Sequence, residues 1–312
     1  MLRFLLRRLA VILPTLLLVI TLAFFMMRLA PGGPFTMDRK LSPEIERNVM
    51  ARYGMDRPLV VQYVGYLEDV ARGDFGPSLK YKDKTVLEVI REGFPKSLAI
   101  GLPALLIAAA GGVGLGAAAA LRQNKPTDYA AMTLAVLGVC IPTFVTAPIL
   151  VLIFASKLGW LPTAGWPSEG QGLGGIKNLI LPIAVLALPQ IAIISRLVRA
   201  GMIETLHANY IRTARAKGLS ETAVVMRHAL RAAILPLVGY LGPACAGLIT
   251  GSLVVEQIFQ LPGLGKSFVI GALQRDYTVV MGVVILYASL ILLLNLVADL
   301  LQAALDPRIR LS

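Results

Sequence analysis

Two features of this sequence bring together residue types that could do chemistry. Residues 263–267 read GLGKS, which resembles the end of a phosphate-binding loop. The full pattern requires another glycine five positions before Gly265, and that position is Gln260. No hydrolytic triad is credible either, because the sequence has only two histidines, His207 and His228, and both lie in one predicted hairpin at residues 200–236. We therefore expect no catalytic residue, metal site or nucleotide site in this chain.

The densest positive charge lies in a short stretch from Tyr210 to Pro236, between segments that are almost wholly apolar. Gly218 is typical of the residue that ends a short helix, here over residues 208–218. Ser220 is typical of the N-cap of a second helix. The charged residues of this predicted helical hairpin are Arg212, Arg215, Lys217, Arg227, Arg231 and Glu221.

A basic helical hairpin has two uses in a membrane protein. It can lie on anionic lipid headgroups, where each Lys or Arg contributes about 1 kcal/mol. It can also insert into a groove on a soluble partner and convey motion to the two membrane helices that it joins. The glycine break and the two-helix form favour the second use, because a surface anchor needs only one continuous basic helix.

The elements that must position this hairpin are apolar. Hydrophobic residues make up 56% of the 312 residues and charged residues 15%, whereas a soluble domain carries roughly a quarter charged residues. The apolar residues form long blocks, so the sequence predicts an all-α polytopic membrane protein. Six blocks approach the 20 residues that a crossing needs. They are Leu9–Met27, Leu98–Leu121, Tyr129–Phe154, Leu179–Ile194, Ile234–Val255 and Val279–Leu301.

The net charge of +12 follows the topology of a membrane protein and needs no nucleic-acid partner, because no soluble basic domain exists to bind one. Lys and Arg collect in the second and fourth connections and after the sixth crossing, which predicts cytoplasmic N- and C-termini. In this scheme the first crossing is an uncleaved helix, and Arg196 and Arg199 belong to the fourth connection. Cys140 and Cys245 lie in apolar segments and indicate neither a disulfide nor a metal site.

The first connection, residues 31–96, is too long and too patterned for a linker. Ser42, followed by proline, predicts a helix start, and Gly54 predicts its end. Residues 58–73 place apolar side chains at helical spacing before Gly73, and residues 85–93 repeat the pattern briefly. We expect a small helical cap on the outer face. Two roles stay open for it, a lid packed on the bundle and a docking surface for an external partner.

The predicted crossings carry no charged side chain at mid-depth, where ion-coupled carriers place theirs. A transporter of this kind takes its energy from outside the chain. Gly112 and Gly116 have the spacing that allows two membrane helices to approach closely. Three polar residues are candidates to line a translocation pathway: Thr143, Gln190 and Ser195.

Several motifs together resemble the ABC importer permeases of the peptide/nickel branch. The stretch RTARAKG up to Gly218, followed by Leu235 and Pro236, is similar to the cytoplasmic coupling loop of that family, although Arg212 replaces the usual leading acidic residue. The segments RLAPGGPF, GDFGPSLKYKD, SLVVEQIFQLPGLG, RDYTVVMG and DPRIR extend the similarity over nearly the full length. The resemblance implies a type I ABC importer permease fold in the bacterial inner membrane, with a helical extracytoplasmic insertion between helices 1 and 2.

The resemblance also implies the partners and the site. A second homologous permease subunit, two cytoplasmic ATPases that bind ATP and Mg²⁺, and an extracytoplasmic peptide-binding protein complete an importer of oligopeptides. The ATPase-coupling residues carried over are Arg212, Thr213, Ala214, Arg215, Ala216, Lys217, Gly218, Leu235 and Pro236.

The expected domain division has four parts: residues 1–30 with the first helix, the insertion 31–96, the permease core 97–304 with the coupling hairpin 200–236, and the tail 305–312. Dipeptide, glutathione or nickel importers of the same branch stay open as alternatives. A secondary carrier or channel is the alternative from another class.

Overall fold

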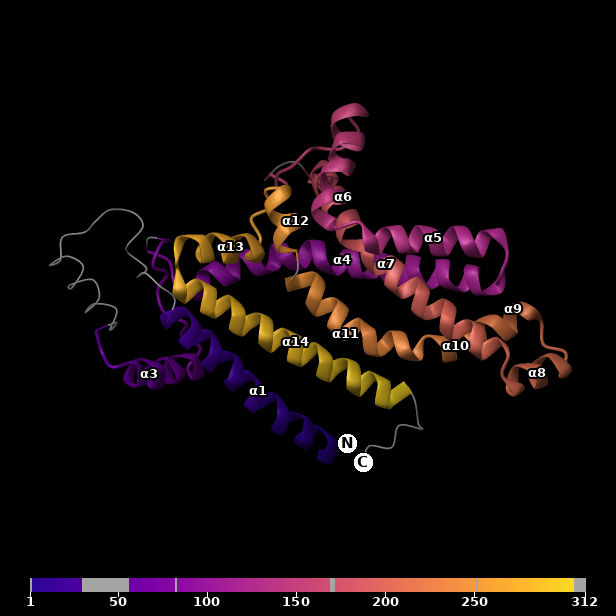
Figure 1. The fold of residues 1–312 in the computed structure, drawn as a ribbon, viewed down its shortest axis with the longest axis horizontal. Coiled ribbons are helices and arrows are strands. Elements are labelled where there is room, and N and C mark those ends of the chain that lie inside the picture. Colours follow the sequence, from indigo (N-terminus) through magenta and orange to yellow (C-terminus); the bar gives the residue numbers. More distant parts are fainter. Residues whose placement is uncertain (1, 30–55, 82, 169–171, 251, 306–312) are drawn as a thin grey trace. The chain divides into compact units, whose positions relative to one another are not determined.

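The computed structural model describes residues 2–29, 56–81, 83–168, 172–250 and 252–305. The helix predicted to start at Ser42 and the basic tail with Arg308 and Arg310 lie outside these ranges. The described residues are almost entirely helical, with one isolated bridge between Pro77 and Thr85. The elements are α1 Leu2–Leu29, α3 Leu59–Ala71, α4 Val86–Leu121, α5 Pro126–Cys140, α6 Thr143–Leu150, the π-helical turns η1 Val151–Lys157 and η3 Val224–Ala229, the 3₁₀ turn η2 Gly172–Ile176, α7 Lys177–Leu206, α8 Asn209–Ala216, α9 Glu221–Ala223, α10 Leu230–Ala233, α11 Leu235–Thr250, α12 Leu253–Ile258, α13 Leu264–Gln274 and α14 Tyr277–Leu305 (Figure 1).

Five helices within the described ranges are long and apolar enough to cross a membrane, or six when one bent pair counts as a single span. The predicted fold class is therefore confirmed. The bent pair is the third predicted crossing, which turns by 106° between α5 and α6. This apolar block therefore forms a broken span and not one continuous helix. Pro142 has no N–H for the helical ladder, and both Ile141 and Pro142 adopt extended backbone angles.

Two other crossings are longer than the sequence predicted. Helix α4 starts at Val86 rather than Leu98, so residues 86–93 form its first turns and not a separate short helix. A reciprocal capping box fixes this start, because the Glu88 carboxylate accepts from the Thr85 N–H at 2.7 Å and the Thr85 hydroxyl accepts from the Glu88 N–H at 3.3 Å. Helix α7 continues to Leu206. Arg196 and Arg199 therefore lie inside a helix and not in a connection.

The chain divides into two compact units, and the first comprises residues 1–96 and 262–290. Helix α3 confirms the amphipathic helix predicted in the first connection. Its Tyr63 packs its ring against Phe24 of α1 at 5.4 Å and shares a hydrogen bond of 2.6 Å with Thr21. Buried Asp276, before α14, accepts hydrogen bonds from the Ser78 hydroxyl at 2.5 Å and from the Lys80 N–H at 3.2 Å. These contacts fasten the segment that precedes α4.

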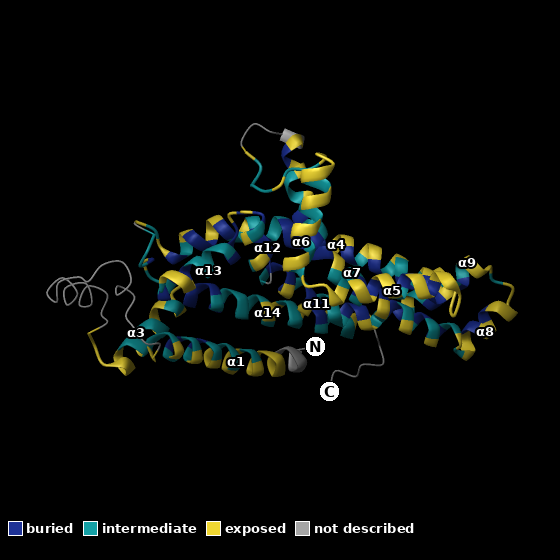
Figure 2. Ribbon diagram, turned by 45° about the horizontal axis from the view of Figure 1, so that its top comes forward, coloured by how far each residue is buried: buried dark blue, intermediate teal, exposed yellow. Residues whose placement is uncertain are grey.

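The second unit comprises residues 97–261 and 291–312, and α7 is its central helix. Helices α5, α6, α10, α11 and α12 all pack against α7. The predicted glycine pair lies where α4 approaches α7: a Cβ on Gly112 would stand 2.6 Å from Ile194, and one on Gly116 would stand 2.5 Å from the Ser195 carbonyl oxygen. Only glycine permits this approach. Buried residues follow the inner faces of these helices, and exposed apolar residues follow α1 and the outer face of α5 (Figure 2).

Candidate functional site

The predicted basic hairpin forms at the end of α7. Helix α8 ends at Ala216, and the expected glycine, Gly218, follows two residues later with φ +78°. The Gly218 N–H donates to the Arg215 carbonyl at 2.9 Å, and the Leu219 N–H donates to the Ala214 carbonyl at 3.4 Å. A left-handed residue at this place closes a helix, and glycine adopts it without steric cost. The chain then reverses direction within two residues.

The second arm starts with the predicted cap. The Ser220 hydroxyl accepts from the Ala223 N–H at 3.4 Å. An ion pair joins the two arms: the Arg215 guanidinium donates to the Glu221 carboxylate at 2.7 Å and 3.2 Å. This pairing lowers the pKa of Glu221 and raises the pKa of Arg215. The arm continues through α9, η3 and α10 and, after a turn at Ile234, into α11.

The inner face of the hairpin is apolar and packed. Ile211 and Ala214 of α8 are buried in the same core as Val224 and Ala229 of the second arm and Met202 of α7. This shared core makes the hairpin a continuation of the two long helices that it joins.

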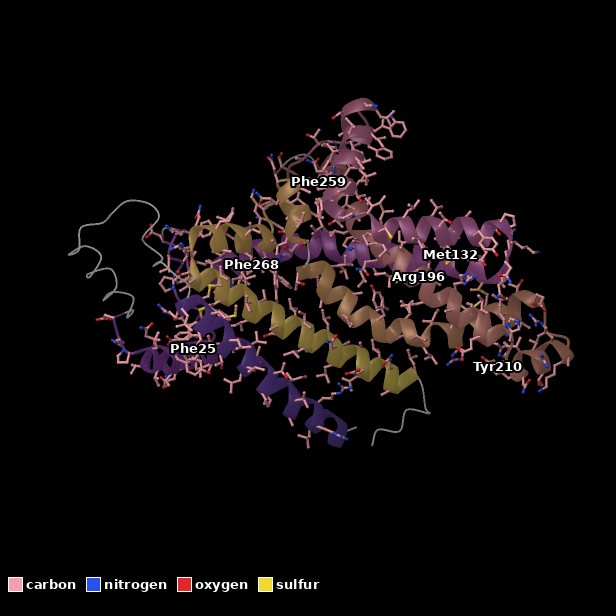
Figure 3. All side chains as sticks on the ribbon, viewed as in Figure 1. Phe25, Met132, Arg196, Tyr210, Phe259 and Phe268 are labelled. Atoms are coloured by element: carbon pink, nitrogen blue, oxygen red, sulfur yellow. The ribbon has the colours of Figure 1, made fainter. Side chains whose placement is uncertain are left out.

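The outer face of α8 and its turn carries most of the predicted coupling residues. Six of them are exposed: Arg212, Thr213, Arg215, Ala216, Lys217 and Gly218. Two large apolar side chains of the hairpin are exposed as well, Tyr210 at 47% and Met226 at 58%. Figure 3 shows Tyr210 projecting from the hairpin end of this unit. The surface therefore combines positive charge with exposed apolar side chains, a composition that suits protein contact.

The remaining coupling residues have other environments. Ala214 is buried in the core of the hairpin, as the helix period of α8 requires. Leu235 is half-buried and Pro236 is exposed at the start of α11. Pro236 lacks an N–H, and the helical pattern is interrupted by a turn at Ile234 just before it. Leu235 and Pro236 thus mark where the second arm meets the membrane helix.

The three candidate pathway residues have different surroundings. Gln190 of α7 accepts a hydrogen bond of 2.5 Å from the Tyr240 hydroxyl of α11. Thr143 is half-buried at the start of α6, directly after the bend. Ser195 is fully buried, and its hydroxyl donates to the Ala192 carbonyl one turn earlier at 2.9 Å. Among the three, Ser195 lies at the contact between α4 and α7 and faces no open surface of this chain.

Two buried polar clusters were missed by sequence reasoning. Asp128 at the start of α5 is 1% exposed and accepts both edge hydrogen bonds of Arg199, each at 2.6 Å. Glu256 of α12 is fully buried and accepts hydrogen bonds from the hydroxyls of Ser97, at 2.6 Å, and Ser252. A charged residue immediately next to the end of a predicted apolar block was the available signal in both cases.

No group of three or more His, Cys, Asp or Glu side chains is placed to hold a metal ion within the described ranges. The GLGKS stretch forms the first turn of α13 after Gly263 and follows no strand. The structure thus gives it no phosphate-loop context.

Comparison with known proteins identifies the family of this chain. Residues 112–311 match the model of the binding-protein-dependent transport system inner membrane component, and residues 1–101 match the model of the N-terminal part of such membrane components. The chain belongs to this family. The resemblance to ABC importer permeases found in the sequence is thereby confirmed, and the chain is a multi-pass inner-membrane protein.

Relatives of this transport component cover its full length. The oligopeptide transport system permease protein OppB of Haemophilus influenzae is 50% identical over 99% of this chain and 100% of its own. OppB of Salmonella typhimurium is also 50% identical over the same shares. The dipeptide transport system permease protein DppB of Bacillus subtilis is 42% identical over 100% of this chain and 99% of its own.

Solved structures support the fold of the transport component. The MetNI methionine ABC transporter, in an inward-facing conformation, gives a TM-score of 0.57 at 18% identity, covering 70% of this chain and 97% of that one. An amino acid ABC transporter gives 0.51 at 16% identity, covering 72% and 95%. At such identity the likeness concerns the fold alone.

Proposed function

We propose that this chain is the transmembrane permease subunit of an ATP-driven oligopeptide importer. The observation that carries the proposal is the 50% identity, over 99% of the chain, to permeases named for oligopeptide transport. The relatives named for dipeptide transport are less similar, at 42% and 39%. A dipeptide importer is therefore the second candidate. Nickel and glutathione stay as further alternatives within the branch.

The proposed assembly contains two different permease subunits, this chain and a homologous sibling. Two cytoplasmic ATPase subunits bind ATP and Mg²⁺ and do the catalysis, while this chain is not catalytic. An extracytoplasmic binding protein delivers peptide to the insertion 31–96, and the permease core spans residues 97–304. Both termini, including the tail 305–312, lie in the cytoplasm.

In the proposed mechanism the outer face of α8 sits in a groove of an ATPase subunit. Closure of the ATPase dimer on ATP moves the groove, and with it the segment Arg212–Gly218. Because Ile211 and Ala214 share a core with α7, the movement passes into α7 and α11 and opens the pathway outward. Hydrolysis of ATP then resets the pathway toward the cytoplasm.

The proposed pathway residues are mild hydrogen-bonding groups rather than charges. Gln190 and Thr143 offer donors and acceptors that suit a peptide backbone of any sequence. The bond between Gln190 and Tyr240 joins α7 to α11, the two helices that the hairpin moves. Ser195 belongs to this set only in a conformation that separates α7 from α4.

The test is transport by the complete complex in proteoliposomes. Vesicles containing both permeases and both ATPases, with the binding protein added outside and ATP inside, are offered labelled oligopeptide, dipeptide, glutathione or Ni²⁺. The proposal expects ATP-dependent uptake of oligopeptide that exceeds uptake of the other three. Preference for dipeptide, glutathione or nickel would reassign the solute. Uptake without ATP would contradict the proposed ATP-driven mechanism.

A further inference from the structure

An open cavity of about 530 Å³ lies in the second unit at the surface shared by α5 and α7. Met132 of α5 and five residues of α7 line it: Ile193, Arg196, Leu197, Arg199 and Ala200. Figure 3 shows Met132 and Arg196 side by side at this place. The walls are mainly apolar, and the polar groups come from two arginines one turn apart.

The two arginines differ in their partners. Arg199 is committed to Asp128, with both hydrogen bonds at 2.6 Å, and the Asn124 N–H adds a third donor to the same carboxylate. Arg196 is exposed and forms no hydrogen bond or ion pair with any residue in the part of the chain that the structure describes. The cavity therefore contains one guanidinium, that of Arg196, which has no charged partner among the described residues and lies beside apolar side chains.

The position along α7 places this guanidinium at a membrane boundary. Arg196 follows Lys177, the first residue of α7, by 19 residues. At 1.5 Å per residue this is about 28 Å, close to the hydrocarbon thickness of about 30 Å. Tyr129, one turn before Met132 on α5, is 63% exposed, and exposed tyrosines mark the level of lipid headgroups.

The surface beyond the cavity is suited to acyl chains. Helix α5 exposes Leu134 at 66%, with Val136 and Leu137 also exposed. An amphiphile with an anionic head and an apolar body would match both parts of the site. Guanidinium binds phosphate through paired hydrogen bonds and gives up its hydration more readily than an ammonium group.

We propose that this cavity binds the headgroup of an anionic phospholipid of the inner leaflet, with Arg196 on the phosphate and Met132, Ile193 and Leu197 against the start of an acyl chain. The inference rests on the cytoplasmic placement of this end of α7 in the proposed function. It does not depend on which solute is transported. The bound lipid stands at the end of α7 that continues into the basic hairpin.

The test measures lipid retained by the intact complex. The complex is placed in nanodiscs of equal parts phosphatidylglycerol and phosphatidylcholine, extracted in mild detergent, and its bound lipids are quantified by native mass spectrometry. The variants are Arg196→Gln, Arg196→Lys and the matched control Arg122→Gln, which removes an exposed arginine after α4 that does not line the cavity.

We expect Arg196→Gln to lose retained phosphatidylglycerol about fivefold or more, since each cation near the headgroups contributes about 1 kcal/mol. Arg196→Lys should retain an intermediate amount, and Arg122→Gln should match the unaltered complex. Equal retention in Arg196→Gln and Arg122→Gln would overturn the proposal, as would equal retention of both lipids.

Two other results would also overturn it. Loss of the sibling permease from the Arg196→Gln complex would identify the cavity as a protein interface. A raised KM for peptide with unchanged lipid retention would place Arg196 in the substrate pathway. The lipid readout does not require the oligopeptide assignment to be right, because lipid retention is measured without transport.

Discussion

Gly201 of α7 lies against Ala233 of α10 so closely that a Cβ on residue 201 would stand 3.1 Å from the Ala233 carbonyl oxygen. This contact holds the second arm of the hairpin against the membrane helix that precedes the hairpin. The buried core shared by Ile211, Val224 and Met202 packs the hairpin against α7 as well.

Gly201→Val should destabilise the hairpin. The added side chain meets backbone atoms of α10, which cannot give way as a flexible side chain would, so we expect a loss of about 1–3 kcal/mol. Thermal unfolding of the purified complex measures this. Gly247→Val is the matched control, since a Cβ on exposed Gly247 of α11 meets nothing within 4 Å. Equal melting temperatures for both variants would show that the contact with Ala233 is loose.

Gly218→Trp should abolish coupling while leaving insertion intact. Space for a Cβ is open at Gly218, so the ring would project from the outer face that we propose meets the ATPase. Its φ of +78° adds a backbone cost of about 1–2 kcal/mol. The measurement is peptide-dependent ATP hydrolysis alongside membrane content.

Gly218→Asn is the control for that variant, because asparagine tolerates the left-handed conformation without a large side chain. It should keep most of the coupling. Normal peptide uptake by Gly218→Trp would contradict the placement of this surface in the motor interface.

Asp128→Asn should destabilise the second unit by up to about 3 kcal/mol, since it leaves Arg199 without its carboxylate in a mostly buried setting. The double variant Asp128→Asn with Arg199→Gln should recover part of the loss. Glu92→Gln removes the exposed partner of Lys84 and should change stability by about 1 kcal/mol or less. Additive effects of the two changes at 128 and 199 would argue against a coupled pair.

The Arg215–Glu221 ion pair predicts that the stability of the hairpin changes with pH only under acidic conditions. Its pairing lowers the pKa of Glu221 below the usual 4.5. A lowered carboxyl pKa contributes stability above the unfolded pKa, and this contribution is lost as pH falls through the folded pKa. Glu221→Gln should therefore raise amide exchange in α8 at neutral pH, and the difference from the unaltered chain should vanish in acid. If the difference in amide exchange between Glu221→Gln and the unaltered chain grew on acidification, the lowered pKa of Glu221 could not be its cause.

Local signals predicted the hairpin correctly. Gly218 and Ser220 act within a few residues of themselves, so their roles as helix end and cap could be read from the sequence. The apolar blocks gave the number of crossings for the same reason. Their ends were less well predicted, because α4 and α7 extend beyond the apolar region as amphipathic helix, which hydropathy alone does not delimit.

Other features depended on distant parts of the chain. Asp128 pairs with Arg199 across 71 positions, and no local pattern specifies that partner. Ser195 is a polar residue at the end of a predicted crossing, and its burial follows from the close approach of Gly116 of another helix. Pro142 lies at the bend between α5 and α6, whereas Pro182 and Pro189 leave α7 continuous. Packing decides between these outcomes, and packing is set by the whole fold.

The central claim is that this chain is a passive conduit whose hairpin is moved by an external ATPase. The most direct measurement compares oligopeptide entry into vesicles containing this chain alone with entry into vesicles containing the full complex and ATP. We expect oligopeptide entry only with the full complex and ATP, and none when that complex carries Gly218→Trp. Entry of peptide through the chain alone, with neither partner subunits nor nucleotide, would contradict it.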